Sequence, residues 1–77
     1  MKNYKISVII PCYNEELVIG KTYDRLVEVM QKNNYSDYEM VFIDDGSRDN
    51  TVKIIYDLSL KDSKVKILVL SRNFGKE

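Results

Sequence analysis

The chain has 77 residues, enough for one small domain with a modest core. Hydrophobic residues make up 44% and charged residues 31%, an ordinary composition for a globular chain that argues against disorder. Twelve basic and twelve acidic residues cancel, which argues against nucleic acid as a partner, and a single cysteine without histidine excludes an internal disulfide and a Cys/His zinc site.

Three apolar segments predict strands, and each is followed by polar residues. The first, Ile6 to Ile10, is β-branched apart from Ser7 and is expected to end at Pro11, because proline cannot donate to a sheet ladder. The second expected strand runs from Glu39 to Ile43, and the third runs from Val65 to Leu70.

Two segments between these strands predict helices. The first helix is expected from Glu16 to about Lys32 with Asn14 as its N-cap, and the second from about Asp49 to Lys61 with Ser47 or Asp49 as its cap. Apolar residues recur at helical spacing in both: Ile19, Tyr23, Leu26, Val27 and Met30 in the first, and Val52, Ile54, Ile55 and Leu58 in the second.

The resulting order is β-α-β-α-β, with connections long enough to hold helices. Strands joined in this way are parallel, and their crossovers are expected to be right-handed. The sequence therefore predicts an α/β fold with the architecture of a nucleotide-binding half-domain. A third strand of this kind normally leads into another helix, so we expect the domain to be incomplete over residues 1–77.

Side chains suited to ligand contact follow each predicted strand. They are Pro11, Tyr13 and Glu15 after the first strand, Asp44 and Asp45 after the second, and Arg72, Asn73 and Lys76 after the third. The carboxyl ends of parallel strands meet at one edge of the sheet, where open α/β sheets bind ligands. A tyrosine there can stack on a planar base, a carboxylate can accept from base or ribose donors, and Arg72 or Lys76 can meet a phosphate.

Structural interpretations of the same residues stay open. Asp44 and Asp45 can equally well satisfy N–H groups of a turn or a helix start. Spacing alone favours Tyr13 as a half-buried aromatic at a strand end and Glu15 as an acid in the first turn of a helix.

Other features of the sequence argue against particular kinds of site. Arg72 and Lys76 are solvated by default, and Cys12 is expected to be a small buried hydrophobic residue, since no histidine can activate its thiol. The absence of Gly-x-Gly-x-x-Gly and of a phosphate-cradling Gly-Lys-Ser/Thr loop argues against a Rossmann dehydrogenase or a P-loop enzyme.

Three motifs together carry a resemblance to a known family. They are Val8 to Glu16 (VIIPCYNEE), Val41 to Thr51 (VFIDDGSRDNT) and Ser71 to Glu77 (SRNFGKE). In this order and spacing the chain resembles the start of family 2 glycosyltransferases of the GT-A fold, a Rossmann-like nucleotide-diphospho-sugar transferase fold. The last motif is similar to the branch that contains dolichyl-phosphate mannose synthase and the bacterial undecaprenyl-phosphate (bactoprenol) sugar transferases.

The resemblance implies transfer of a sugar, with inversion, from a nucleotide-sugar donor (a UDP- or GDP-sugar) to a polyprenyl phosphate, in the synthesis of envelope glycans. Residues 1–77 would be the amino-terminal nucleotide-binding portion of the catalytic domain. The implied roles are a nucleoside pocket lined by Pro11, Tyr13 and Glu15, base contacts from Ile43 and Asp45, a brace or a contact from Asp44, and phosphate contacts from Arg72 and Lys76.

The family resemblance also implies what the chain lacks. Family members hold Mg²⁺ or Mn²⁺ on an Asp-x-Asp motif after a further helix and strand, so Asp44-Asp45 is not that motif, and we expect no metal ligand, no catalytic residue and no turnover in this chain alone. The expected location is cytoplasmic, with the parent protein at the cytoplasmic face of the membrane.

Two other classes of protein are weighed against this interpretation. The chain can be a non-catalytic nucleotide-binding or self-associating module, because an incomplete sheet leaves an unpaired edge and an uncovered apolar face. A receiver-like domain with an acidic pocket is disfavoured, since its paired acids should follow the first strand rather than the second.

Overall fold

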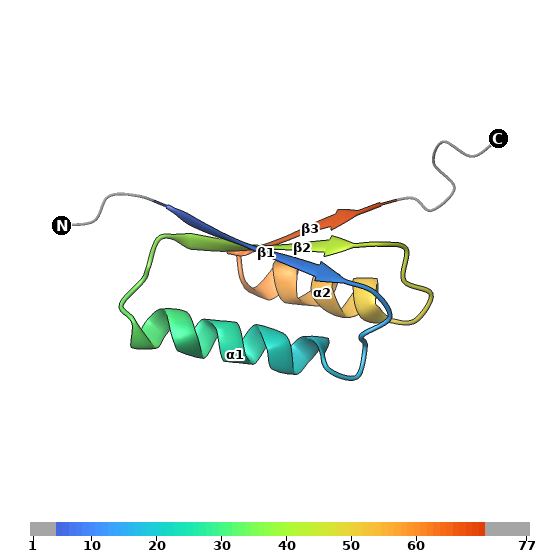
Figure 1. Cartoon of the computed structure of the whole chain (residues 1–77), viewed down its shortest axis with the longest axis horizontal. Helices are drawn as coiled ribbons and strands as arrows, with labels where there is room; N and C mark the ends of the chain where they lie inside the picture. Colours follow the sequence, from blue (N-terminus) through green and yellow to red (C-terminus); the bar gives the residue numbers. More distant parts are fainter. Residues whose placement is uncertain (1–4, 71–77) are drawn as a thin grey trace.

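The computed structural model of the chain describes residues 5–70. Its elements in order are β1 (Ile6–Cys12), α1 (Ile19–Lys32), β2 (Tyr38–Asp44), α2 (Thr51–Lys61) and β3 (Val65–Val69). The strands form one parallel sheet in the order β1-β2-β3, and both helices lie against the same face of it (Figure 1). The predicted α/β fold with a parallel β-α-β-α-β order is therefore confirmed.

The core lies between the sheet and the two helices. β2 is the central strand, and its side chains alternate so that Tyr38, Met40 and Phe42 are buried. The other buried hydrophobic residues of the cluster are Cys12, Ile19, Met30, Ile55 and Val65. Burial of these side chains is the main favourable contribution to folding, and Phe42 and Met40 are fully inaccessible at its centre.

The two predicted apolar faces of the helices are the faces that pack on the sheet. In α1, Ile19 and Met30 are buried, while the three apolar residues between them pack against the core. In α2, Ile55 is buried, with Ile54 and Leu58 beside it. The helical spacing in the sequence therefore identified the buried faces correctly.

The prediction that the first strand ends at Pro11 is wrong. β1 continues to Cys12, and Pro11 pairs in register with Ile43 of β2. β1 has a single neighbour in the described sheet, and proline is tolerated on such a strand because its missing N–H can face away from the neighbour. β2 is also longer than expected and includes Asp44, whereas β3 ends one residue early, at Val69.

The predicted start of the first helix is also wrong. α1 begins at Ile19 rather than Glu16, and Asn14 is not its N-cap but adopts a left-handed conformation with φ 50°. A turn precedes the helix, in which the Glu15 carbonyl accepts the amides of Val18 (3.0 Å) and Ile19 (2.8 Å). Spacing favoured Glu15 as an acid of the first helical turn, but Glu15 lies before the helix.

The second helix begins later than predicted as well. α2 starts at Thr51 and has Asn50 at its N-cap position, so neither Ser47 nor Asp49 is the N-cap residue. The Asp49 carboxylate nevertheless accepts the Thr51 amide at 3.0 Å. Both predicted caps accept hydrogen bonds from amides of the loop after β1, Ser47 from Asn14 and Asp49 from Glu16.

The second face of the sheet has no helix over it within residues 5–70 (Figure 1). Ile9 and Leu68 on this face are 55% and 52% exposed, and Val41 and Ile43 of β2 are partly exposed between them. The described part of the chain therefore presents an apolar sheet surface to its surroundings. Neither described helix has the length and apolarity needed to cross a membrane.

Candidate functional site

The carboxyl ends of β1 and β2 form the walls of a small surface pocket. It has a volume of about 220 Å³ and is lined by Pro11, Cys12, Tyr13, Glu15 and Asp45. The Asp45 amide donates to the Cys12 carbonyl at 3.0 Å, which holds the two strand ends together beyond the last ladder pair. Sites for drug-sized ligands usually measure about 300 to 1,000 Å³, so this pocket by itself is too small to enclose such a ligand.

Four of the sequence-predicted site residues thus meet in this pocket. Ile43 lies next to it, because it pairs with Pro11 in the sheet register and is partly exposed on the helix-free face. Tyr13 directly follows β1 and is 43% exposed, which agrees with a half-buried aromatic at a strand end. Arg72 and Lys76, like Asn73, lie outside the described residues.

The two adjacent carboxylates of the second motif have different environments. Asp44 is fully buried, and its Oδ2 accepts the amides of Gly46 (3.0 Å) and Ser47 (2.8 Å). Its Oδ1 accepts the Ser47 hydroxyl in a short hydrogen bond. Gly46 turns the chain with φ 87°, a conformation in which glycine carries no steric penalty. Asp44 is therefore a structural brace of the turn, while Asp45 is exposed at the pocket.

A set of hydrogen bonds joins the loop after β1 to the loop after β2. The Asn14 amide donates to Ser47 Oγ at 2.8 Å, and Asn14 Oδ1 accepts the Arg48 amide at 2.8 Å. The two bonds run in opposite directions, so they fix both the distance and the relative orientation of the loops.

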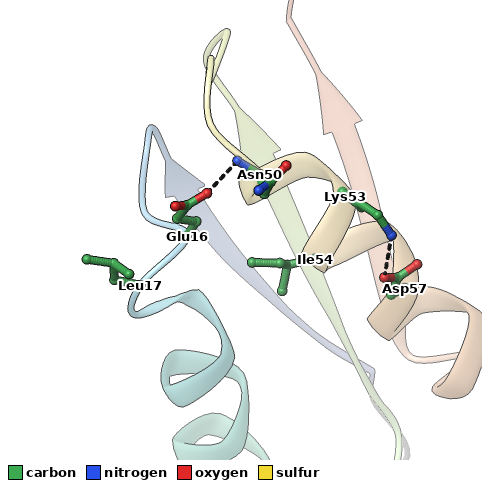
Figure 2. A pocket seen from close by; sticks show the side chains of 6 residues that line it. All are labelled: Glu16, Leu17, Asn50, Lys53, Ile54 and Asp57. Carbon is green, nitrogen blue, oxygen red and sulfur yellow. Dashed lines mark hydrogen bonds and ion pairs between the residues drawn. The ribbon is translucent and has the colours of Figure 1, made fainter.

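Three further bonds link the same loops closer to α2. The Glu15 amide donates to Thr51 Oγ1 at 2.7 Å, and the Glu16 amide donates to Asp49 Oδ2 at 3.2 Å. In return, Glu16 Oε1 accepts the Asn50 amide at 2.8 Å (Figure 2). We call the residues whose side chains make these bonds the loop clasp: Asn14, Glu16, Ser47, Asp49 and Thr51.

Sequence reasoning missed the loop clasp. It assigned Asn14, Ser47 and Asp49 to local helix caps, and it gave no role to the side chains of Glu16 and Thr51. A signal was present, because two motif loops at one sheet edge both carry short polar side chains. Such side chains can form hydrogen bonds with amides of another loop as readily as with amides at the start of the helix that follows them. Spacing along the chain cannot distinguish these two kinds of partner.

Asp49 is the most strongly engaged acid of the clasp. Partial desolvation by itself raises the pKa of this carboxyl, but hydrogen bonds from the Thr51 hydroxyl, the Thr51 amide and the Glu16 amide outweigh it and hold the pKa below the usual value of 3.8. The charged form of Asp49 is therefore the form that this arrangement stabilises.

Cys12 lines the pocket although it is only 4% exposed. Burial, followed by the nearby charges of Asp44 and Glu15, raises the pKa of its thiol from 9.0 to about 11. The thiol is therefore protonated at neutral pH and is a poor nucleophile. This confirms the expectation of a small buried hydrophobic residue.

The described residues do not offer a site for Mg²⁺ or Mn²⁺. Within residues 5–70 no group of three or more potential ligand side chains could hold a metal ion. Both carboxylate oxygens of Asp44 are already engaged by the turn that follows it. The Asp44 carboxylate is therefore engaged in holding the turn after β2.

A second surface groove lies between the loop after β1 and the start of α2 (Figure 2). Its volume is about 390 Å³, and its lining residues are Glu16, Leu17, Asn50, Lys53, Ile54 and Asp57. Lys53 and Asp57 form an ion pair of 3.2 Å one helical turn apart, and Leu17 is 85% exposed. Glu16 belongs to both the groove and the loop clasp, and its carboxylate accepts the Asn50 amide where the two meet (Figure 2).

Comparison with known proteins agrees with this architecture. The sequence profile of the family described as "Glycosyl transferase family 2" matches residues 7–77. The β-α-β-α-β arrangement is that of a Rossmann-like half of the GT-A type. The chain belongs to glycosyl transferase family 2.

Several curated relatives are similar over nearly the whole chain. It is 47% identical over 74 residues, 96% of its length, to a protein named uncharacterized glycosyltransferase YkcC of Bacillus subtilis (strain 168). It is 44% identical over 73 residues, 95% of its length, to the prophage bactoprenol glucosyl transferase homolog of Escherichia coli (strain K12). It is 36% identical over 72 residues, 92% of its length, to the undecaprenyl-phosphate 4-deoxy-4-formamido-L-arabinose transferase of Proteus mirabilis (strain HI4320). The matched regions are 23%, 24% and 22% of these proteins, so the chain spans about a quarter of their length.

Proposed function

We propose that the chain is the amino-terminal, nucleotide-binding portion of an inverting glycosyltransferase that takes its sugar from a nucleotide-sugar donor. The observation that carries the proposal is the pocket at the carboxyl ends of β1 and β2, which brings together Pro11, Tyr13, Glu15 and Asp45. Open parallel sheets bind ligands at this edge, and the chain belongs to a glycosyltransferase family.

The chemistry of the pocket suits a nucleoside. The exposed Tyr13 ring can stack on the base, with Pro11 and the neighbouring Ile43 supplying apolar contacts. The Asp45 carboxylate accepts a hydrogen bond from a base N–H, and Glu15 contributes a second carboxylate for ribose hydroxyls. We propose a UDP- or GDP-sugar as the donor, because uracil and guanine both carry such an N–H.

The proposed acceptor is a polyprenyl phosphate at the cytoplasmic face of the membrane, for envelope glycan synthesis. This rests on relatives whose names refer to bactoprenol and undecaprenyl phosphate. A phosphate acceptor is already anionic, so the reaction has less need of a strong general base. Arg72 and Lys76 are proposed to contact donor or acceptor phosphate.

Nucleotide binding is tested by isothermal titration of the full-length gene product with UDP, GDP and CDP. Binding of UDP or GDP, weakened by Asp45→Asn, is the expected result. Lys66→Gln is a suitable control, because Lys66 lies on β3 outside the residues that line the pocket. Equal affinity of the wild type and the Asp45 variant contradicts the proposed base contact.

Sugar transfer is tested with radiolabelled nucleotide sugar, a polyprenyl phosphate and Mn²⁺. We expect the full-length gene product to transfer the sugar and residues 1–77 alone not to do so. The reason is that the family resemblance places the metal-binding Asp-x-Asp motif beyond Glu77. Clear turnover by the 77 residues contradicts their assignment as a nucleotide-binding portion only.

Self-association of the 77-residue chain is a second candidate function, favoured by the apolar sheet face that contains Ile9, Val41, Ile43 and Leu68. Exposed contiguous apolar surface commonly marks an interaction site. Size-exclusion chromatography with light scattering tests it, and a monomer at high concentration contradicts it.

A further inference from the structure

We propose that Thr51, together with Asn14, is a positioning residue of the nucleoside pocket, holding the Tyr13–Glu15 segment against Asp45 through the loop clasp. This inference rests on the proposed function, since it concerns the affinity of the same pocket for a nucleotide. Neither residue lines the pocket, so each acts through the main chain of the residues that do.

The Thr51 hydroxyl has a single possible orientation. Thr51 is fully buried, and its Oγ1 lies 2.7 Å from the Glu15 amide nitrogen and 2.5 Å from Asp49 Oδ1. An ionised carboxylate only accepts and an amide only donates, so the hydroxyl proton points to Asp49 and a lone pair points to Glu15. A hydroxyl oriented from both sides fixes the Glu15 amide more firmly than a freely rotating one.

The residue that carries this hydroxyl is anchored in the core. Thr51 is the first residue of α2, and Ile55, four residues later on the same helical face, is fully buried in the core. Asp49 binds the next amide, that of Glu16, with its second oxygen. The pocket segment is therefore anchored to the start of α2, although in sequence it leads into α1.

Asn14 fixes the other side of the segment. Its left-handed backbone turns the chain directly after Tyr13, and its Oδ1 accepts the Arg48 amide at 2.8 Å. Asparagine and aspartate tolerate this conformation, and both carry the required acceptor, whereas glycine tolerates the conformation without supplying the acceptor. The position thus combines a backbone requirement with a hydrogen-bond requirement.

The test uses matched substitutions in the full-length gene product, with UDP and GDP as titrants. Thr51→Val keeps the shape of the side chain but leaves the Glu15 amide without its acceptor, and we expect the Kd to rise about tenfold. Thr51→Ser keeps the hydroxyl and is expected to stay within about twofold of the wild type. Thr22→Val is the control, because it removes a threonine hydroxyl bond from α1, to the Val18 carbonyl, outside the clasp.

The kinetic pattern separates positioning from a general loss of structure. With the donor sugar as the varied substrate, Thr51→Val is expected to raise KM about tenfold and to leave kcat unchanged, because the clasp acts equally on the bound substrate and the transition state. A second pair of variants changes Asn14, which is exposed, so no buried side chain is altered. Asn14→Gly is expected to raise the Kd for the nucleotide several-fold, whereas Asn14→Asp, which keeps the acceptor for the Arg48 amide, is expected to keep the Kd of the wild type.

The outcomes distinguish this inference from the function on which it rests. A gene product that binds neither UDP nor GDP overturns the proposed function and the inference with it. A wild type that binds, with Thr51→Val folded and equally tight, overturns the inference alone. Should Thr51→Val fail to fold, equal affinities of Asn14→Gly and the wild type overturn it.

Discussion

Replacing Asp44 by asparagine is expected to destabilise the fold, whereas the same change at Asp45 is not. The Asp44 carboxylate is fully buried and accepts two amides through Oδ2 and the Ser47 hydroxyl through Oδ1. An asparagine oxygen placed at the Oδ2 position can keep both amides. Its NH2 group then replaces Oδ1, so the Ser47 hydroxyl loses its acceptor and the remaining bonds lose their charge assistance.

The magnitude follows from these losses. A hydrogen bond to a charged group contributes about 1.5 to 3 kcal/mol to stability. The asparagine NH2 recovers part of one bond by donating to Ser47 Oγ. We therefore expect Asp44→Asn to lower the free energy of unfolding by about 2 kcal/mol. A domain of this size loses about 4 to 8 °C in Tm for each kcal/mol, which predicts a Tm about 8 to 16 °C lower. Asp45 is exposed, so Asp45→Asn should change stability by less than about 0.5 kcal/mol.

The assay is thermal unfolding of the 77-residue chain followed by circular dichroism at pH 7, together with nucleotide titration below the transition of each variant. Asp44→Asn should lower the Tm, and Asp45→Asn should weaken nucleotide binding more than Asp44→Asn does. Equal losses of stability in the two variants, or equal losses of affinity, refute the division of roles between the adjacent acids.

Three other predictions follow from single contacts. Tyr23→Phe should lower the free energy of unfolding in urea by about 1 kcal/mol, because the Tyr23 hydroxyl donates to Asp62 at 2.6 Å and connects α1 to the turn after α2. An unchanged urea midpoint of unfolding contradicts this prediction. The pKa of Asp49 is lower in the fold than its usual 3.8, so its stabilising contribution is present above pH 3.8 and is lost as the pH falls through the lower pKa of the folded state. The hydrogen-exchange protection factor of the Glu16 amide, which is the intrinsic rate divided by the observed rate at the same pH, should therefore fall in acid, and Asp49→Asn should abolish that fall. Burial raises the pKa of Cys12 from 9.0 to about 11, so the contribution of the protonated thiol to stability is complete below pH 9 and is lost as the pH rises toward 11. Iodoacetamide should therefore leave Cys12 unmodified at pH 7.5 in the folded chain and should react with it in urea.

The architecture could be predicted from the sequence because it depends on periodic burial. The apolar spacing from Ile19 to Met30 and the run into Phe42 identified the helical face and the central strand without any tertiary information. The strand end at Pro11 was missed, because the effect of a proline depends on whether its strand has one neighbour or two, which sequence spacing does not show.

The candidate site was predicted in part, for a similar reason. The meeting of Pro11, Tyr13, Glu15 and Asp45 follows from parallel strands ending at one edge. Alternation along β2 also distinguishes the adjacent acids, since Asp44 continues the buried series of Met40 and Phe42, but only once the strand is known to include Asp44. The loop clasp could not be predicted, because its donors and acceptors come from loops whose contact exists only in the folded chain.

The loop clasp also determines when the pocket can form during folding. Its five bonds join residues 33 to 36 positions apart, so each requires closure of a long segment of chain. We expect contacts of such separation to form after the local turns of α1 and α2, together with the pairing of β1 and β2. A partly folded chain can therefore contain both helices and still lack the pocket. Ligand binding consequently reports on completion of the sheet rather than on helix content.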